Sequence, residues 1–218
     1  MTFLNQLHTE GTADLQLIEK WWVDRVVALS APKPMPLRFR KDWSLGRMYE
    51  NLLTRARRIH KHQGTYYVEQ LISQYFLRAI LQVSSIGQGQ QWDRHAQVRR
   101  SSDTGPIDFT FGDTVVRLAI PFTGDAIRRP FGYRPGCLQN VIITSENAVA
   151  STRILAEYEG TANRVWVISL AQFLDSAFIA LGGCYPGRRA ELARQLVDVY
   201  NQEAREDDIP VKYMLVFV

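Results

Sequence analysis

Residues 105–120 read GPIDFTFGDTVVRLAI. Runs rich in Phe, Val and Ile flank a glycine and an aspartate, which together supply the backbone freedom that a tight turn needs. The pattern predicts a β-hairpin with Asp108 inside its first strand. A carboxylate within an apolar hairpin is costly to bury unless it is paired or binds a metal. Asp108 is therefore either a functional carboxylate or an exposed residue near a strand end.

The second strand of this hairpin suggests a partner for that carboxylate. Side chains alternate between the two faces of a strand, so Arg117 shares a face with Val115 and Ala119. An arginine in the middle of a strand needs a partner, and Asp108 is the obvious one. The two form either a structural ion pair or a site at which Arg117 stabilises a phosphorane transition state.

Periodicity and turn residues predict the elements on either side of the hairpin. We expect helices over 13–30 and about 44–62, and a third from Thr65 that carries apolar residues to Ile80. Residues 84–106 and 121–136 are predicted to be irregular. The elements after them are a strand over 139–144, a helix over 146–158, a strand over 164–169, helices over 171–180 and about 188–205, and a strand over 211–218.

This order predicts an α/β fold with a mixed central sheet that helices cover on both faces. The core is helix, three strands, helix, strand, and N-terminal helices precede it. We assign residues 1–63 to a basic helical region and 64–218 to the core, expected as one unit. The proline-rich segment 31–36 is the only plausible domain boundary that the composition indicates.

Length and composition exclude several classes of protein. With 218 residues and 46% hydrophobic residues, the chain can bury a full core. No apolar run approaches the ~18 residues of a transmembrane helix. The N-terminus lacks the basic and apolar regions of a signal peptide. Cys137 and Cys184 have no metal-ligand spacing, so we expect free thiols in a cytoplasmic protein.

Positive charge is concentrated in the first third of the chain. Between Lys33 and His62 there are nine Lys and Arg against two acids, although the net charge is only +4. Such a stretch favours a polyanionic partner, most simply DNA, and a solvated basic face is the alternative. Gly182–Arg189 opens a helix with two arginines, and it is either a phosphate site or a plain turn.

The element order resembles the core of the PD-(D/E)xK nucleases, the group that contains most type II restriction endonucleases. Ile107-Asp108 is similar to the first motif, and Glu69 to the acid on the preceding helix. The resemblance implies that Asp108 and Glu69 hold Mg²⁺ for phosphodiester hydrolysis. Where the family has an acid and a lysine, this chain has Arg117-Leu118-Ala119, so Arg117 takes the place of that charge.

A second resemblance covers roughly residues 64–218. It is to a family of restriction proteins encoded beside cytosine DNA methyltransferases, and it implies a restriction-modification role. The segments that look similar are Ile107-Asp108-Phe109, Arg117-Leu118-Ala119, Cys137-Leu138-Gln139-Asn140 and Tyr200-Asn201.

Basic residues near the hairpin and on the second helix, all but one of them arginines, are the predicted DNA contacts. Guanidinium groups suit phosphates and the major-groove edge of guanine, and solvated loop arginines are the alternative. The predicted DNA-binding residues are Arg55, Arg57, Arg58, Lys61, Arg99, Arg100, Arg128, Arg129 and Arg134.

Three functions therefore stand as hypotheses. The first is a Mg²⁺-dependent restriction endonuclease that acts on double-stranded DNA as a homodimer, with Asp108, Glu69 and Arg117 as catalytic residues. The second is a non-catalytic DNA-binding or regulatory protein on a nuclease-like scaffold, which the missing acid and lysine favour. The third is an enzyme that acts on a phosphorylated small molecule through its arginine-rich loops.

Overall fold

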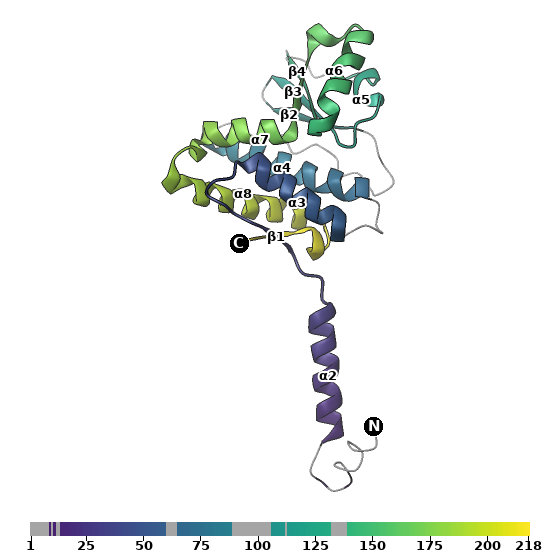
Figure 1. The fold of residues 1–218 in the computed structure, drawn as a ribbon, viewed down its shortest axis with the longest axis vertical. Coiled ribbons are helices and arrows are strands. Elements are labelled where there is room, and N and C mark those ends of the chain that lie inside the picture. Colours follow the sequence, from purple (N-terminus) through teal and green to yellow (C-terminus); the bar gives the residue numbers. More distant parts are fainter. Residues whose placement is uncertain are drawn as a thin grey trace. The chain divides into compact units, whose positions relative to one another are not determined.

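The computed structural model describes residues 9, 11, 14–59, 65–88, 106–111, 113–131 and 139–218. Contacts divide the chain into two units, Met1–Lys33 and Pro34–Val218 (Figure 1). The boundary falls inside the proline-rich segment 31–36. The structure does not divide at the assigned position between residues 63 and 64, because the second predicted helix packs into the core of the later unit.

The first unit is built on helix α2 (Leu15–Ser30). Asp14 caps it, since its Oδ1 accepts hydrogen bonds from the backbone N–H of Gln16 and Leu17 at 2.9 and 3.1 Å. The rings of Trp21 and Trp22 meet edge to face, with centroids 5.1 Å apart. Within its own unit α2 does not bury these two rings in a core.

A mixed four-stranded sheet lies in the second unit, as the sequence predicted. Its strands are β2 (Ile107–Phe111), β3 (Thr114–Ala119), β4 (Gln139–Thr144) and β5 (Val165–Ser169), in that order across the sheet. The predicted hairpin is confirmed, because β2 and β3 are antiparallel. The other two pairings are parallel.

Helices cover both faces of this sheet, which confirms the predicted α/β class. One face packs against the main core with α3 (Leu45–Ile59), α4 (Thr65–Gln88), α7 (Leu170–Phe178) and α8 (Pro186–Glu206). On the other face α5 (Asp125–Arg128) and α6 (Val149–Tyr158) close a smaller core. Figure 1 shows α5 and α6 beside the sheet and away from α8.

The alternation in β3 follows the two cores. Val116 and Leu118 belong to the main core, and Ala119 belongs to the smaller one. Arg117 lies on the side of the smaller core, as the period of two predicted. The burial of this strand on both faces explains why the charged group there needs internal partners.

Three predicted boundaries need correction. Helix α4 continues to Gln88, so residues 84–88 are helical, and residues 89–105 lie outside the described chain. The irregular stretch 121–136 contains the short helix α5. The final strand is only β6 (Leu215–Phe217), because residues Val211–Tyr213 form a 3₁₀ turn after Pro210.

Strand β6 pairs in parallel with β1 (Met35–Leu37), which overlaps the end of the proline-rich segment 31–36 and was not predicted as a strand. Asn201 on α8 holds β6 in place. Its Nδ2 donates to the Leu215 carbonyl and its Oδ1 accepts from the Leu215 N–H, both at 2.8 Å. The Tyr200 hydroxyl donates to the Tyr213 carbonyl at 2.9 Å. The Tyr200-Asn201 pair therefore anchors the C-terminal strand.

No helix in the described part of the chain combines the length and apolarity that crossing a bilayer requires.

Candidate functional site

Asp108 and Arg117 face each other across the hairpin. Their Cα positions are direct partners in the antiparallel register. Arg117 Nε lies 2.6 Å from Asp108 Oδ1, and Nη2 lies 2.7 Å from Oδ2. The arginine side chain is fully buried, whereas that of Asp108 is 30% exposed. The predicted ion pair is confirmed as a two-pronged, charge-assisted contact.

The remaining donors of Arg117 bind the segment that contains α5. Nη1 donates to the carbonyls of Ala126 and Arg129 at 3.1 and 2.5 Å, and Nη2 donates to that of Pro130 at 2.8 Å. The Phe131 ring covers the guanidinium, with its centroid 4.0 Å from Cζ. A guanidinium has five N–H donors, and each one here has an acceptor. No donor is left for a phosphate, so Arg117 is a structural clamp.

Glu69 is held by a different arginine. Its Oε1 lies 2.5 Å from Nε of Arg57, which joins α4 to α3. The hydrogen bond that Arg57 donates to Glu69 raises the pKa of Arg57. The structure thus places each of the two predicted metal ligands against its own guanidinium.

These carboxylates do not fit a Mg²⁺ site as they stand. Both oxygens of Asp108 accept from Arg117, and a divalent cation would have to compete with that fixed positive charge. In the described parts of the chain, no three His, Cys, Asp or Glu side chains are grouped to hold a metal. The assignment of Asp108 and Glu69 as ligands stays a prediction, and their pairing does not favour it.

The predicted DNA contacts on α3 are partly committed to the fold. Arg55 is partly buried and donates to the Pro36 carbonyl, and burial lowers its pKa. Arg57 binds Glu69, and Arg58 is exposed. Lys61 lies outside the described residues.

The loop arginines divide in the same way. Arg128 is exposed and pairs with Glu159 at 2.9 Å, which raises the pKa of Arg128. Arg129 is exposed, and its carbonyl accepts from Arg117. The predicted contacts that lie outside the described residues are Arg99, Arg100 and Arg134.

A basic surface surrounds Trp43, and the sequence did not predict it because its residues come from distant segments. Arg40 and Arg47 lie over its ring, with Cζ 4.9 and 4.8 Å from the ring centroid. Arg189, from the start of α8, donates to the Trp43 carbonyl. We call this group the Trp43 surface. Arg40, Arg47 and Arg189 contact Trp43, and we add their chain neighbours Lys41 and Arg188 and, further along α8, Arg194.

Two close contacts hold the start of α3 against α7. Gly46, in the first turn of α3, approaches α7 so closely that a Cβ there would lie 2.5 Å from the Ala171 carbonyl oxygen. The Gly46 N–H also donates to Asp175 Oδ1 on α7 at 2.6 Å. The start of α3 is therefore fixed in position, and Trp43 is fixed with it.

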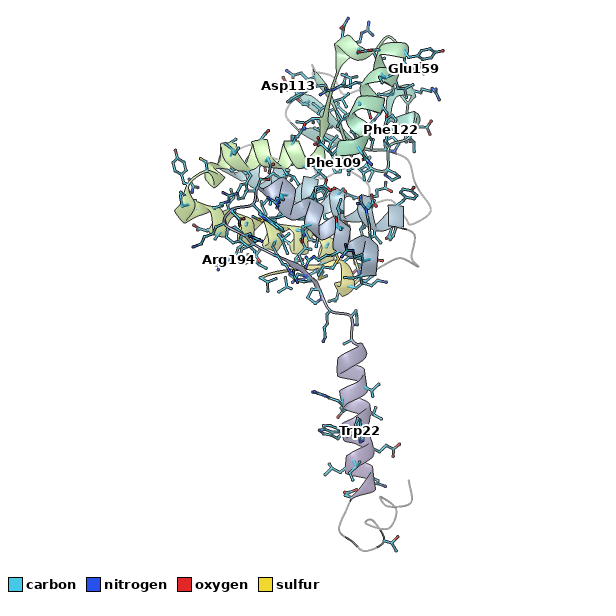
Figure 2. All side chains as sticks on the ribbon, viewed as in Figure 1. Trp22, Phe109, Asp113, Phe122, Glu159 and Arg194 are labelled. Carbon is cyan, nitrogen blue, oxygen red and sulfur yellow. The ribbon has the colours of Figure 1, made fainter. Side chains whose placement is uncertain are left out.

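Aromatic contacts extend the surface along α8. The guanidinium of Arg194 lies over Phe217 at 5.2 Å from the ring centroid, and Phe217 packs against Phe39 with centroids 5.4 Å apart. Figure 2 labels Arg194 on its helix. Residues from β6, α8 and the connection between β1 and α3 therefore form one continuous surface.

This surface carries more basic than acidic members. Every basic member except Arg189 is exposed. Asp42 pairs with Arg40 at 3.1 Å, and this hydrogen bond lowers the pKa of Asp42 although both side chains are exposed. Exposed guanidinium and ammonium groups set around a rigid aromatic ring are suited to phosphate contacts.

The sequence contained the signals for the Trp43 surface, but separately. Arg40, Lys41 and Arg47 belong to the basic first third, and Arg188 and Arg189 belong to the segment Gly182–Arg189, for which a phosphate site and a plain turn are the two interpretations. Nothing local indicates that the two segments meet. Comparisons with models of protein families, with curated proteins and with solved structures found no match to this chain.

Proposed function

We propose that this protein binds double-stranded DNA without cleaving it, as a DNA-binding or regulatory protein, through the Trp43 surface. The observation that carries the proposal is the convergence of basic side chains from two distant segments around Trp43. Phosphate contacts of this kind supply most of the affinity of sequence-independent DNA binding.

The restriction endonuclease is the second candidate. The order helix, three strands, helix, strand favours it, although α5 is inserted between the second and third strands. The pairing of Asp108 with Arg117 and of Glu69 with Arg57 is the reason that we place it second. In this candidate the two carboxylates would first have to leave those arginines.

Salt dependence of DNA binding tests the assigned surface. We would measure the anisotropy of a labelled 20-base-pair duplex over a range of salt concentrations. The triple variant Arg47→Ala, Arg188→Ala, Arg194→Ala should weaken binding and reduce the log–log salt slope by up to about 3, roughly one unit for each lost phosphate contact.

A charge-matched control separates the surface from net charge. The variant Arg128→Ala, Arg153→Ala, Arg205→Ala also removes three exposed positive charges, on α5, α6 and the far end of α8. It should keep nearly the parental slope. Equal losses in the two triple variants would contradict the assignment of the Trp43 surface.

Incubation of plasmid and phage DNA with Mg²⁺ or Mn²⁺ separates the two candidates. The proposal expects intact DNA with a mobility shift. Discrete metal-dependent fragments, lost on adding EDTA, would overturn the non-catalytic proposal in favour of the endonuclease.

A further inference from the structure

Strand β5 lies at an edge of the sheet and exposes a tryptophan. Trp166, its second residue, is 60% exposed although its neighbours Val167 and Ile168 are buried. Of the described strands, only β4 pairs with β5. The indole therefore stands at the amino-terminal end of an edge strand, where the main core no longer covers it.

A hollow of about 540 Å³ opens beside this indole. Its volume lies within the range of about 300–1,000 Å³ that is usual for small-molecule sites. The described residues that line it come from the starts of β4 and β5 and from the turn before β5: Gln139, Asn140, Asn163, Arg164, Val165 and Trp166.

A smaller hollow of about 250 Å³ also includes Trp166 in its lining, together with Arg153 and Glu157 of α6. Arg153 Nη2 donates to the Val167 carbonyl at 3.0 Å. This contact occupies a backbone acceptor of β5, so the edge is poorly suited to adding a peptide strand. The larger hollow is the better candidate for a ligand.

The lining of the larger hollow has a specific chemistry. It offers a flat indole, three side-chain amides and one guanidinium, and none of its described lining residues is acidic. Amides pair a donor with an acceptor and so match the edges of nucleobases. Aromatic rings stack on bases whatever the sequence, and guanidinium groups bind phosphate.

We propose that this hollow binds a single unpaired nucleotide, with its base stacked on Trp166 and its phosphate against Arg164. A paired base cannot reach the indole because both of its faces are stacked inside the duplex. A free nucleotide and an unpaired position in a DNA strand offer the same chemistry. The DNA form of this inference rests on the proposed function, and the free-nucleotide form does not.

The test compares two duplexes that differ only in one bulged, unpaired adenine. The full chain should bind the bulged duplex about tenfold more tightly than the paired one, as expected for one stacked base. Trp166→Ala should remove this preference, and Trp166→Phe should restore part of it. Tyr158→Ala is the matched control, since Tyr158 is an exposed aromatic residue that does not line the hollow.

A calorimetric titration with dAMP distinguishes a free nucleotide from an unpaired position in DNA. The free-nucleotide form is supported if the chain binds dAMP, if Trp166→Ala and Arg164→Ala both weaken that binding, and if the chain shows no preference for the bulged duplex. The triple variant of the Trp43 surface should lower the affinity for both duplexes equally and leave dAMP binding unchanged. Failure of the proposed function can therefore be told apart from failure of this inference. No preference for the bulge and no dAMP binding would overturn the inference.

Discussion

At the scale of single residues, Arg117 shows how one buried charge organises its surroundings. Its guanidinium binds Asp108 on the neighbouring strand and three carbonyls on the segment after β3. A buried ion is retained only where partners replace the water that it loses. Arg117 thus joins the hairpin to α5, and its loss would remove the donor that these acceptors share.

We expect Arg117→Ala to destabilise the protein by about 3 kcal/mol, because it leaves the Asp108 carboxylate and three carbonyls without their partner. Arg117→Lys should also destabilise it, since an ammonium cannot reproduce the planar fork. Urea unfolding measures both effects.

The control for this prediction is Arg128→Ala, which removes an exposed arginine that pairs with Glu159 near the same segment. It should leave the urea midpoint unchanged. If Arg117→Ala kept the urea midpoint of the parent chain, the clamp would be dispensable. Arg117 would then again be a candidate for the catalytic role.

At the scale of elements, two contacts hold the Trp43 surface. The first is the approach of α3 to α7 at Gly46. Gly46→Ala should destabilise the protein by about 1–3 kcal/mol, because the new methyl group would overlap the Ala171 carbonyl and push the helices apart. It should also weaken DNA binding, since Trp43 would move with α3.

Gly187→Ala is the control for this substitution, because a Cβ built there meets nothing within 4 Å apart from its chain neighbours and its own helix backbone. Its unfolding temperature should equal or slightly exceed that of the parent chain, because alanine is the better helix former, and the duplex anisotropy measurement should be unchanged. If Gly46→Ala behaved in the same way, the α3–α7 contact would not be the one that positions the surface.

The second contact is the anchoring of β6 by Asn201. Asn201→Ala should destabilise the protein by about 2 kcal/mol, because it leaves the N–H and carbonyl of the buried Leu215 without the side-chain amide. Hydrogen exchange should show faster exchange at Leu215 than in the parent chain.

Gln202→Ala offers a neighbouring comparison, since Gln202 is exposed and its amide donates to Glu206 on the same helix. Its exchange pattern at β6 should match the parent. Unchanged protection of Leu215 in Asn201→Ala would show that pairing with β1 alone holds the strand.

At the scale of the whole molecule, the boundary after Lys33 separates α2 from everything that forms the candidate sites. A chain that begins at Pro34 should therefore fold with the same urea midpoint and m-value for its core as the full chain. It should also keep the effect of the Trp43 triple variant on the salt slope. Loss of cooperative unfolding would show that the first unit is needed for folding.

The local part of the fold was predictable because it depends on short-range geometry. The turn at Asp113, the alternation in β3 and the pairing of Asp108 with Arg117 all follow from the period of a strand and the reach of a hairpin. The helices α3 and α4 were predictable for the same reason. The length of α4 beyond residue 83 was missed because its last turns are polar.

The long-range part was not predictable from local patterns. The pairing of β1 with β6, the meeting of Trp43 with Arg189 and the capture of Glu69 by Arg57 join segments separated in the chain. Several of the basic residues look equivalent in sequence. Packing decides which of them bind structural carbonyls or carboxylates and which face solvent.

The sequence by itself therefore determined the α/β class, the hairpin and the ion pair within it, because backbone periodicity and turn chemistry act over a few residues. Only the tertiary structure decided which charges are available for a partner. It commits Arg55, Arg57 and Arg117 to internal contacts and leaves the Trp43 surface open. The physical reason is that burial and long-range contacts, which no local pattern encodes, decide the partners of a charged group.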